Sequence, residues 1–355
     1  MKAIITGTGS SLPEKVVKNS HFSDNIFYEK SGEKTGKSGA EFAEKLETIT
    51  GIRERRYIRD DEDSVPLMTA ASRRAIDDAG IEVNDIQGII VAHNAGNMLT
   101  DGRGIHSVPN MAALLKNALK VENHDCFAYD LLFGCPGWLQ SVIQAKQVLA
   151  DDVNAQNILV VGVEVASRFL DPHDLDSMIL ADGCGACIVS KSKSRTKGIL
   201  SYATYSHAQA DLKYIYQNES LNAEVPGSSY FKMSGRDVYK YATTWLPQVI
   251  KNALDKAGKT LDDVDIFLFH QANGKMLQAI AQNLATLYGQ KDYNFEGKIP
   301  TTIEVLGNTS VATIPTLMDM VLKNQIKGYK INKGQLAVMA SVGAGMHCNA
   351  LVYQF

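Results

Sequence analysis

Two stretches of the sequence decide its fold: AGIEVNDIQGIIVAHNAG over residues 79–96 and AGKTLDDVDIFLFHQANG over residues 257–274. They align without a gap at an offset of 178, about half of the 355-residue chain. Each stretch contains, in order, a helix end with glycine, an acidic turn, an apolar strand and a polar loop that ends in glycine. Such a match at this distance predicts a duplicated αβ unit.

Two further matches keep the same order along the chain. FGC over residues 133–135 and LGN over residues 306–308 each open a helix, and residues 157–163 match residues 335–341 as buried strands. The three matches predict two halves that face each other across a pseudo-twofold axis. Cys135 and Asn308 then lie opposite each other, each at the start of a helix.

Short apolar runs alternate with amphipathic stretches elsewhere, which predicts an α/β layered fold. We expect strands over residues 3–6, 88–92, 158–163, 186–189, 266–269 and 336–340, and helices over residues 66–79, 139–150, 239–257, 275–288 and 314–323. Residues 30–40 and the basic run over residues 191–197 predict solvated loops. The second run lies just past the midpoint, so we expect an N-terminal half over residues 1–192 and a C-terminal half over residues 193–355.

The composition is that of an ordinary globular protein, with 45% hydrophobic and 21% charged residues. The formal net charge is -3, which argues against nucleic acid or an anionic membrane as the main partner. No apolar run has the length of a membrane span, and the first residues, MKAIITGTGS, do not resemble a signal peptide. We therefore expect a cytoplasmic protein.

The five cysteines predict neither a disulfide framework nor paired zinc knuckles. Cys184 and Cys187 form a CxxC within a small-residue stretch, and we expect them to be buried thiols rather than metal or redox ligands. Cys135 differs, because it lies between a strand over residues 126–131 and a helix announced by Pro136. A thiol at a helix start has its pKa lowered by the helix dipole and free N–H groups. This context alone leaves a nucleophile and a packed thiol equally open.

Two polar residues join Cys135 as candidates. His270 ends an apolar strand, where side chains point into the ligand crevice of an α/β fold, although a satisfied structural histidine is the alternative. His93 has a similar place in the first half but lacks the sequence that follows His270, so we leave it out of the chemistry. Asn308 could be only a helix N-cap, but the repeat makes it the counterpart of Cys135. Gly343 and Gly345 near the C-terminus permit close backbone approach and could aim an N–H at an oxyanion.

The motifs together resemble one family. LPEK over residues 12–15, TGIRER over residues 50–55, Cys135, ADGCGA over residues 181–186, HQAN from His270 and GNTS around Asn308 are similar to the β-ketoacyl-acyl-carrier-protein synthase III family of the thiolase superfamily. The resemblance implies a five-layered αβαβα thiolase-like fold, a homodimer and a catalytic triad of Cys135, His270 and Asn308. It places the oxyanion hole at the backbone N–H groups of Cys135 and Gly345, and implies no metal and no cofactor.

The resemblance also implies a mechanism. Cys135 takes an acyl group from a thioester, and a second substrate then enters on acyl-carrier protein. His270 and Asn308 donate hydrogen bonds to the enolate that forms as malonate loses CO2, and the carbanion attacks the acyl group. Lys240 and Lys275 match basic positions at which the family docks its acidic carrier protein; two solubilising lysines are the alternative.

Departures from the family suggest a specialised branch. Lys45, Ile49 and Leu175 stand where the family grips the adenine of coenzyme A, so free acyl-coenzyme A should be a poor donor. Val108 replaces a bulkier aromatic residue of the acyl pocket, and the loop over residues 95–107 is longer. We favour secondary metabolism, in which two β-ketoacyl units form a cyclohexanedione on the way to dialkylresorcinols.

Other functions stay open. Within the family, a housekeeping synthase III that starts fatty acids, a quinolone-type condensing enzyme and an acyltransferase are the alternatives. A cysteine hydrolase shares the order Cys, His, Asn, but not the papain-type motif or disulfides. A non-catalytic binding homologue would not need the triad, and the HQAN motif argues against a type III polyketide synthase.

Overall fold

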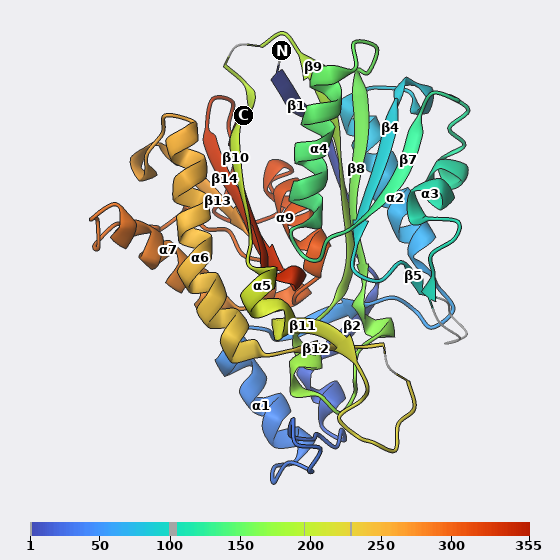
Figure 1. The fold of residues 1–355 in the computed structure, drawn as a ribbon, viewed down its shortest axis with the longest axis vertical. Coiled ribbons are helices and arrows are strands. Elements are labelled where there is room, and N and C mark those ends of the chain that lie inside the picture. The colour runs from blue at the N-terminus through green and yellow to red at the C-terminus, as the bar shows by residue number, and fades with distance from the viewer. Residues whose placement is uncertain (1, 99–104, 195, 228) are drawn as a thin grey trace.

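The computed structural model describes residues 2–98, 105–194, 196–227 and 229–355, and Figure 1 shows two sheets with helices around and between them. In the described chain the first sheet has the order β1 (Lys2–Ser11), β9 (Asp182–Ser192), β8 (Asn157–Val165), β4 (Gly88–His93) and β7 (Phe127–Leu132). The second has the order β10 (Gly198–Ser206), β15 (His347–Gln354), β14 (Leu336–Gly343) and β13 (Ile266–Phe269). β4 is parallel to β8 and β13 to β14, whereas the next two pairs are antiparallel in both sheets. The sheets therefore repeat one pattern.

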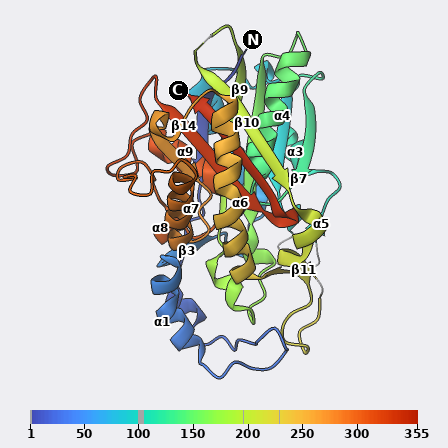
Figure 2. The same ribbon diagram turned by 60° about the vertical axis from the view of Figure 1, so that its left-hand side comes forward.

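Helices complete five layers. Between the sheets lie α4 (Gly137–Asp151) and α9 (Thr313–Leu322), and the outer face of the first sheet is covered by α2 (Ser64–Ala79) and α3 (Met111–Leu119). Figure 2 shows α6 (Gly235–Lys256) and α7 (Gly274–Leu287) side by side on the outer face of the second sheet. In the described part of the chain, no helix is long and apolar enough to cross a bilayer.

Alternating side chains hold these layers together. On β4, Ile90 packs into the central core with Trp138 of α4, whereas the neighbouring Ile89 packs outward under α2 and α3. On β13, Leu268 points into the same central core, and Phe267 packs outward under α6 and α7. Because both faces of each sheet are buried, these strands appear in the sequence as continuous apolar runs.

The two stretches that predicted the duplication adopt the same conformations. Gly80 and Gly258, which follow α2 and α6, both have a φ of 65°, in the left-handed region that glycine adopts without a steric penalty. The acidic turns after them are 3₁₀ helices, η2 (Val83–Asp85) and η6 (Leu261–Asp263), and each is closed by a capping box. β4 and β13 follow these turns.

Smaller elements lie at the carboxyl ends of β8 and β13. They are α1 (Gly39–Thr50), α5 (Ala208–Asp211), α8 (Ile303–Leu306) and the strand pairs β2 (Lys15–Lys18) with β3 (Glu54–Tyr57), β5 (Asn97–Met98) with β6 (Ile105–His106), and β11 (Ile215–Asn218) with β12 (Tyr230–Met233). The predicted loop over residues 30–40 ends early, because Ser38 and Glu41 form a capping box that starts α1 at Gly39. The predicted boundary at residues 192 and 193 coincides with the end of β9, and the division into halves stays a prediction.

The CxxC pair lies on β9, with its thiols on opposite faces. Cys184 packs into the outer core beneath α2, and Cys187 packs into the central core between the sheets. Side chains three residues apart in a strand point in opposite directions, so these thiols cannot share a metal ion or pair with each other. Among the described residues, no group of three or more His, Cys, Asp or Glu side chains could hold a metal ion.

Candidate active site

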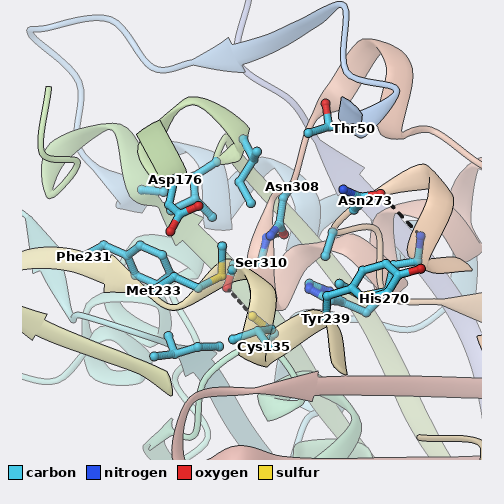
Figure 3. Close-up of a pocket in the computed structure, with 18 of the residues that line it drawn as sticks. Thr50, Cys135, Asp176, Phe231, Met233, Tyr239, His270, Asn273, Asn308 and Ser310 are labelled. Carbon is cyan, nitrogen blue, oxygen red and sulfur yellow. Dashed lines mark hydrogen bonds between the residues drawn. The ribbon is translucent and has the colours of Figure 1, made fainter. Parts of the chain in front are cut away.

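A cavity of about 310 Å³ opens where α4 begins and where β8 and β13 end. Cys135, His270 and Asn308 all line it, and Figure 3 shows their side chains around one space. The structure therefore brings together three residues that the sequence separates by up to 173 positions. Glu164 and Ser310 line the same cavity.

Cys135 lies in the tight turn between β7 and α4. Gly134 in this turn has a φ of 72°, and a Cβ on Gly343 of β14 would lie 2.6 Å from the Cys135 nitrogen, so both positions require glycine. The Cys135 Sγ lies 3.2 Å from the Ser310 Oγ. Burial raises the pKa of the thiol to about 12, although Ser310 and the backbone N–H of Cys135 act against it. The lowered pKa expected from the helix start is thus outweighed by desolvation.

His270 directly follows β13 and is held there by its backbone N–H, which donates to the Ala340 carbonyl at 2.9 Å. Its Nδ1 lies 2.7 Å from the Thr313 Oγ1. Burial lowers the pKa of His270 to about 4, so the ring is neutral near pH 7 and carries a single N–H. The Thr313 hydroxyl has one hydrogen and two acceptors within reach, His270 Nδ1 and the Ser310 carbonyl oxygen at 2.8 Å. In the tautomer in which Nδ1 accepts from Thr313, the ring proton is on Nε2, where it can be donated into the cavity.

Asn308 presents a donor to the same space. Its Oδ1 accepts the backbone N–H of Ser310 at 2.8 Å, which fixes the amide orientation and leaves the Nδ2 hydrogens for the cavity. Its backbone is held on both sides, because its N–H donates to Ile179 and its carbonyl accepts from Ala181. The backbone conformation before Asn308 requires glycine at position 307 for two reasons. Gly307 has a φ of 62°, and a Cβ there would lie 3.0 Å from the Arg55 side chain.

The rest of the HQAN motif has structural contacts. Gln271 is fully buried, and its Oε1 accepts the backbone N–H of Thr302 at 3.2 Å. Asn273 caps α7, because its Oδ1 accepts the backbone N–H groups of Lys275 and Met276. Both side chains therefore hold the loop that positions His270.

Three cavity residues were missed by the sequence analysis. Glu164, near the end of β8, is only 3% exposed, and burial raises its pKa to about 8. Asn94 donates to the Glu164 carboxyl and, at 2.6 Å, to the Ser310 Oγ. Ser310 has a φ of 50°, which is uncommon for a residue with a Cβ. The one signal in the sequence was an acidic residue inside the apolar run over residues 158–165.

Comparison with known proteins identifies the family. Residues 129–208 match 3-oxoacyl-[acyl-carrier-protein] synthase III, and residues 254–355 match its C-terminal part. A β-ketoacyl-[acyl-carrier-protein] synthase III of Staphylococcus saprophyticus is 32% identical over 352 residues, which cover 99% of this chain and 98% of the relative. This chain belongs to the synthase III family.

Solved synthase III structures share its fold. The enzyme of Thermus thermophilus superposes with a TM-score of 0.81 at 27% identity, covering 99% of both chains. That of Aquifex aeolicus VF5 superposes with the same TM-score at 25% identity, covering 99% of this chain and all of the other. The predicted thiolase-like α/β fold is confirmed, and the chain is an acyl-transferring ketosynthase, a condensing enzyme. The readings as a cysteine hydrolase and as a non-catalytic homologue are therefore wrong.

The cavity mouth of this synthase III includes one of the three predicted adenine positions. Ile49 lines the cavity, and its side chain is 56% exposed. Arg236, from the start of α6, also lines the cavity. Leu175 instead packs against the apolar cluster beneath α1, and Lys45 is exposed on α1 outside the cavity lining. Ile49 alone is therefore placed to affect a donor at the mouth.

The predicted docking lysines lie near this mouth. Lys240 is exposed on α6, one turn after Arg236, and Lys275 is exposed in the first turn of the neighbouring α7. Residues four positions apart on a helix share a face, so Arg236 and Lys240 present their charges together. Arg236 was missed because nothing in the sequence indicates which surface cations border the cavity.

Two other predicted residues lie away from the Cys135 cavity. Gly345, with a φ of 74°, lines a second cavity of about 300 Å³, and Gly343 is the glycine that contacts Cys135. Val108 is 86% exposed and lines neither cavity, because it precedes the N-cap of α3 on the surface beside β7. The longer loop expected over residues 95–107 lies partly, at 99–104, outside the described residues.

Proposed function

We propose that this protein is a β-ketoacyl-acyl-carrier-protein synthase III in which Cys135 carries the acyl group and His270 and Asn308 activate the second substrate. One observation supports this most strongly: a thiol, a neutral imidazole and an amide donor converge on a single cavity. A thiol supplies the nucleophile, and two neutral donors are suited to an oxygen on which negative charge develops.

The proposed reaction has two stages. The Cys135 sulfur attacks the thioester carbonyl, the backbone N–H of Cys135 helps to stabilise the tetrahedral oxyanion, and the donor leaves as a thiol. A carrier-bound malonyl group then loses CO2, and His270 and Asn308 donate hydrogen bonds to the resulting enolate oxygen. Its carbon attacks the acyl carbonyl, a carbon–carbon bond forms, and Cys135 is released.

The acyl chain has room beyond the cysteine. The second cavity shares Asn94, Phe169, Ile215 and Phe231 with the first, so the two spaces adjoin. The rings of Phe169 and Phe231, with centroids 6.4 Å apart, lie in their common wall. We propose that medium or branched acyl groups reach the second cavity past these rings, and that Phe231→Ala lengthens the accepted chain.

Two reactions, with different substrates, remain candidates. The similar curated relative is named as a β-ketoacyl-[acyl-carrier-protein] synthase III, which supports the reaction that starts fatty acid synthesis. The dialkylresorcinol-type branch is the second candidate, and Ile49 at the cavity mouth favours it. An aliphatic side chain cannot make the stacking or ion-pair contacts by which an arginine holds a nucleotide.

We also propose the partners. An acidic acyl-carrier protein docks against Arg236, Lys240 and Lys275 beside the cavity mouth. A second copy of the chain covers β7, which is the edge of the first sheet in the described chain. Exposed sheet edges are usually covered, and the exposed Leu132 at the end of β7 (68%) and the neighbouring Val108 would gain burial there.

Intact-protein mass spectrometry tests this proposal. The protein is incubated with matched coenzyme A and carrier-protein thioesters of two to ten carbons, and the acyl adduct is mapped by peptide analysis. The proposal requires an adduct on Cys135 and a β-ketoacyl product after malonyl-carrier protein is added. Efficient use of acetyl-coenzyme A alone supports the housekeeping reaction. A preference for longer carrier-bound groups, with coenzyme A use improved roughly tenfold by Ile49→Arg, supports the specialised branch. An adduct elsewhere, or release of free acid only, contradicts the proposal.

A further inference from the structure

Glu164 is a buried carboxyl group to which the two-stage reaction assigns no role. It lies near the carboxyl end of β8, where its backbone pairs with Gly183 of β9, and its side chain lines the Cys135 cavity. Acidic side chains are seldom buried to 3% exposure unless they are paired or hydrogen-bonded. Its polar contacts therefore need an explanation.

Those contacts form a chain of hydrogen bonds that ends at Cys135. The Cys135 Sγ lies 3.2 Å from the Ser310 Oγ, and the Asn94 amide bridges this hydroxyl to the Glu164 carboxyl. The Ser310 side chain lies close enough to the carboxyl to lower its pKa. Asn94 braces the arrangement, because its Nδ2 donates to both Glu164 and Ser310. Figure 3 shows Ser310 directly above Cys135, with the bond between them dashed.

The backbone of Ser310 is strained in a way that serves this contact. Its φ of 50° places a non-glycine residue in the left-handed region, which costs free energy and persists only where surrounding contacts enforce it. Here the Asn308 Oδ1 accepts the Ser310 N–H, and Thr313 lies 2.8 Å from the Ser310 carbonyl oxygen. These contacts hold the hydroxyl between the thiol and the carboxyl.

We propose that Glu164 accepts the thiol proton of Cys135 through the Ser310 hydroxyl when acylation begins. This inference rests on the proposed role of Cys135 as the acyl acceptor. The S–H bond breaks and its proton passes to the Ser310 Oγ, while the Ser310 proton passes to the Glu164 carboxylate. The sulfur keeps the electron pair and attacks the thioester carbonyl. When the intermediate collapses, the proton on Glu164 passes to the departing thiolate, so the donor leaves as a thiol and the carboxylate is restored.

The charges around Glu164 agree with this role. Burial raises its pKa to about 8 and Asp182 of β9 raises it further, while Asn94 and Ser310 lower it, so both protonation states are accessible near neutral pH. The other titratable or charged groups on the cavity are Cys135, whose thiol Glu164 disfavours as an anion, neutral His270, Asp176, whose pKa burial raises to about 6, and Arg236 and Tyr239. His270 is hydrogen-bonded to Thr313, and within the described part of the chain no hydrogen bond joins its ring to the Cys135 sulfur.

The test is the single-turnover rate of Cys135 acylation between pH 6 and pH 10, measured by rapid quench and mass spectrometry on the full chain. The wild type should show a rise with an apparent pKa near 8. Glu164→Gln, which keeps the shape and an acceptor oxygen, should lose this rise and be slower by about 10²-fold at pH 8.5. Glu164→Asp should retain the rise at a reduced rate. Glu82→Gln makes the same change at an exposed carboxyl outside the site and controls for charge.

A second variant separates this relay from a structural role. Ser310→Ala removes the intermediate hydroxyl and should show the same loss, and the double variant should be no slower than either single one, because the residues act in one path. Additive losses, or a pH profile in Glu164→Gln that matches the wild type, would overturn the relay. If the wild type acquires no acyl group on Cys135, the proposed function fails instead.

Discussion

In each half of the molecule, a histidine lies at the end of a corresponding strand: His93 is the last residue of β4, and His270 directly follows β13. The two histidines have different surroundings. His93 uses both ring nitrogens within the protein: its Nε2 lies 3.0 Å from an Asp130 oxygen, and its Nδ1 accepts the Gly96 N–H at 2.9 Å. His270 is bonded at Nδ1 to Thr313, no described residue bonds its Nε2, and its ring lines the Cys135 cavity. At the offset of 178, His93 aligns with Gln271, one position after His270, so the repeat supplies equivalent strand ends but not equivalent histidines. The free Nε2 of His270 is consistent with the donor role proposed for it.

The helix starts of the two halves differ in a similar way. Cys135 is followed almost at once by α4, whereas the 3₁₀ helix η7 (Ser310–Ala312) separates Asn308 from α9. That extra turn carries Ser310 to the Cys135 sulfur. The second half therefore contributes both the Asn308 amide and the hydroxyl that contacts Cys135 of the first half.

Replacing Cys135, the proposed nucleophile of the first half, should have the largest effect. Cys135→Ser should reduce acylation by ~10³-fold or more, because an alcohol buried in this site is a far weaker nucleophile than a thiol. Intact-protein mass spectrometry measures the adduct, and circular dichroism checks that the fold is retained. Cys348→Ser, at a buried thiol outside the cavity lining, is the control and should still be acylated. Full turnover in Cys135→Ser would disprove the assignment.

The histidine comparison predicts the next effect. His270→Ala should reduce condensation by about 10²–10⁴-fold while acyl-Cys135 still accumulates, because the enolate loses a donor. His93→Ala breaks the contacts with Asp130 and Gly96. It should therefore lower the melting temperature and reduce the rate of the condensation step less than His270→Ala does. Rates of both stages and thermal unfolding are measured for each variant. Equal losses of condensation in the two variants would break the distinction between them.

The sequence could predict what depends on pattern. Apolar period, glycine turns and the repeat predicted the strands of the first sheet, β13 and β14 of the second, and the face-to-face helix starts, because these features depend on local conformation. β10 and β15 were not predicted. It missed what depends on a single close contact: Glu164 appears as one acid in an apolar run, and Ser310 reaches Cys135 through an uncommon φ. The close approach of Gly343, on which a Cβ would lie 2.6 Å from the Cys135 nitrogen, is another such contact, and the oxyanion role of the Gly345 N–H stays a prediction.

Stability should depend on pH in opposite directions for two cavity residues. The pKa of His270 is lowered from 6.5 to about 4, so the unfolded chain binds more protons and stability falls as pH falls from 6.5 to 4. The pKa of Glu164 is raised from 4.5 to about 8, so its contribution is complete below pH 4.5 and is lost as pH rises through 8.

Urea unfolding at pH 4.5, 6.0, 7.5 and 8.5 measures both effects. His270→Asn should remove roughly 1–3 kcal/mol of the loss on the acid side, and Glu164→Gln should remove a similar loss on the alkaline side. His21→Asn, at an exposed histidine, is the control for the acid side. Unfolding free energies that change in parallel for all three variants would mean that neither group titrates as its burial requires.

The smallest effect concerns the outer surfaces of the two halves. At the offset of 178, Lys240 and Lys275 align with Glu62, which pairs with Arg59, and with Asn97, which is buried beside Ser64. At these two aligned positions, therefore, only the second half has exposed cations. Replacing both lysines by glutamate should raise KM for carrier-bound malonate roughly three- to tenfold at low salt, with little change in kcat, because the lysines attract the carrier without contacting the reacting atoms.

Salt and position decide whether this effect comes from docking. The difference between wild type and double variant should shrink at high ionic strength, because exposed charges are screened. Lys256→Glu, at the far end of α6, reverses an exposed charge on the same helix and should leave KM near that of the wild type. A KM that is unchanged in the Lys240 and Lys275 variant, or raised equally by Lys256→Glu, would show that the mouth has no special role. Equal rises in the two variants would mean that net charge alone causes the effect.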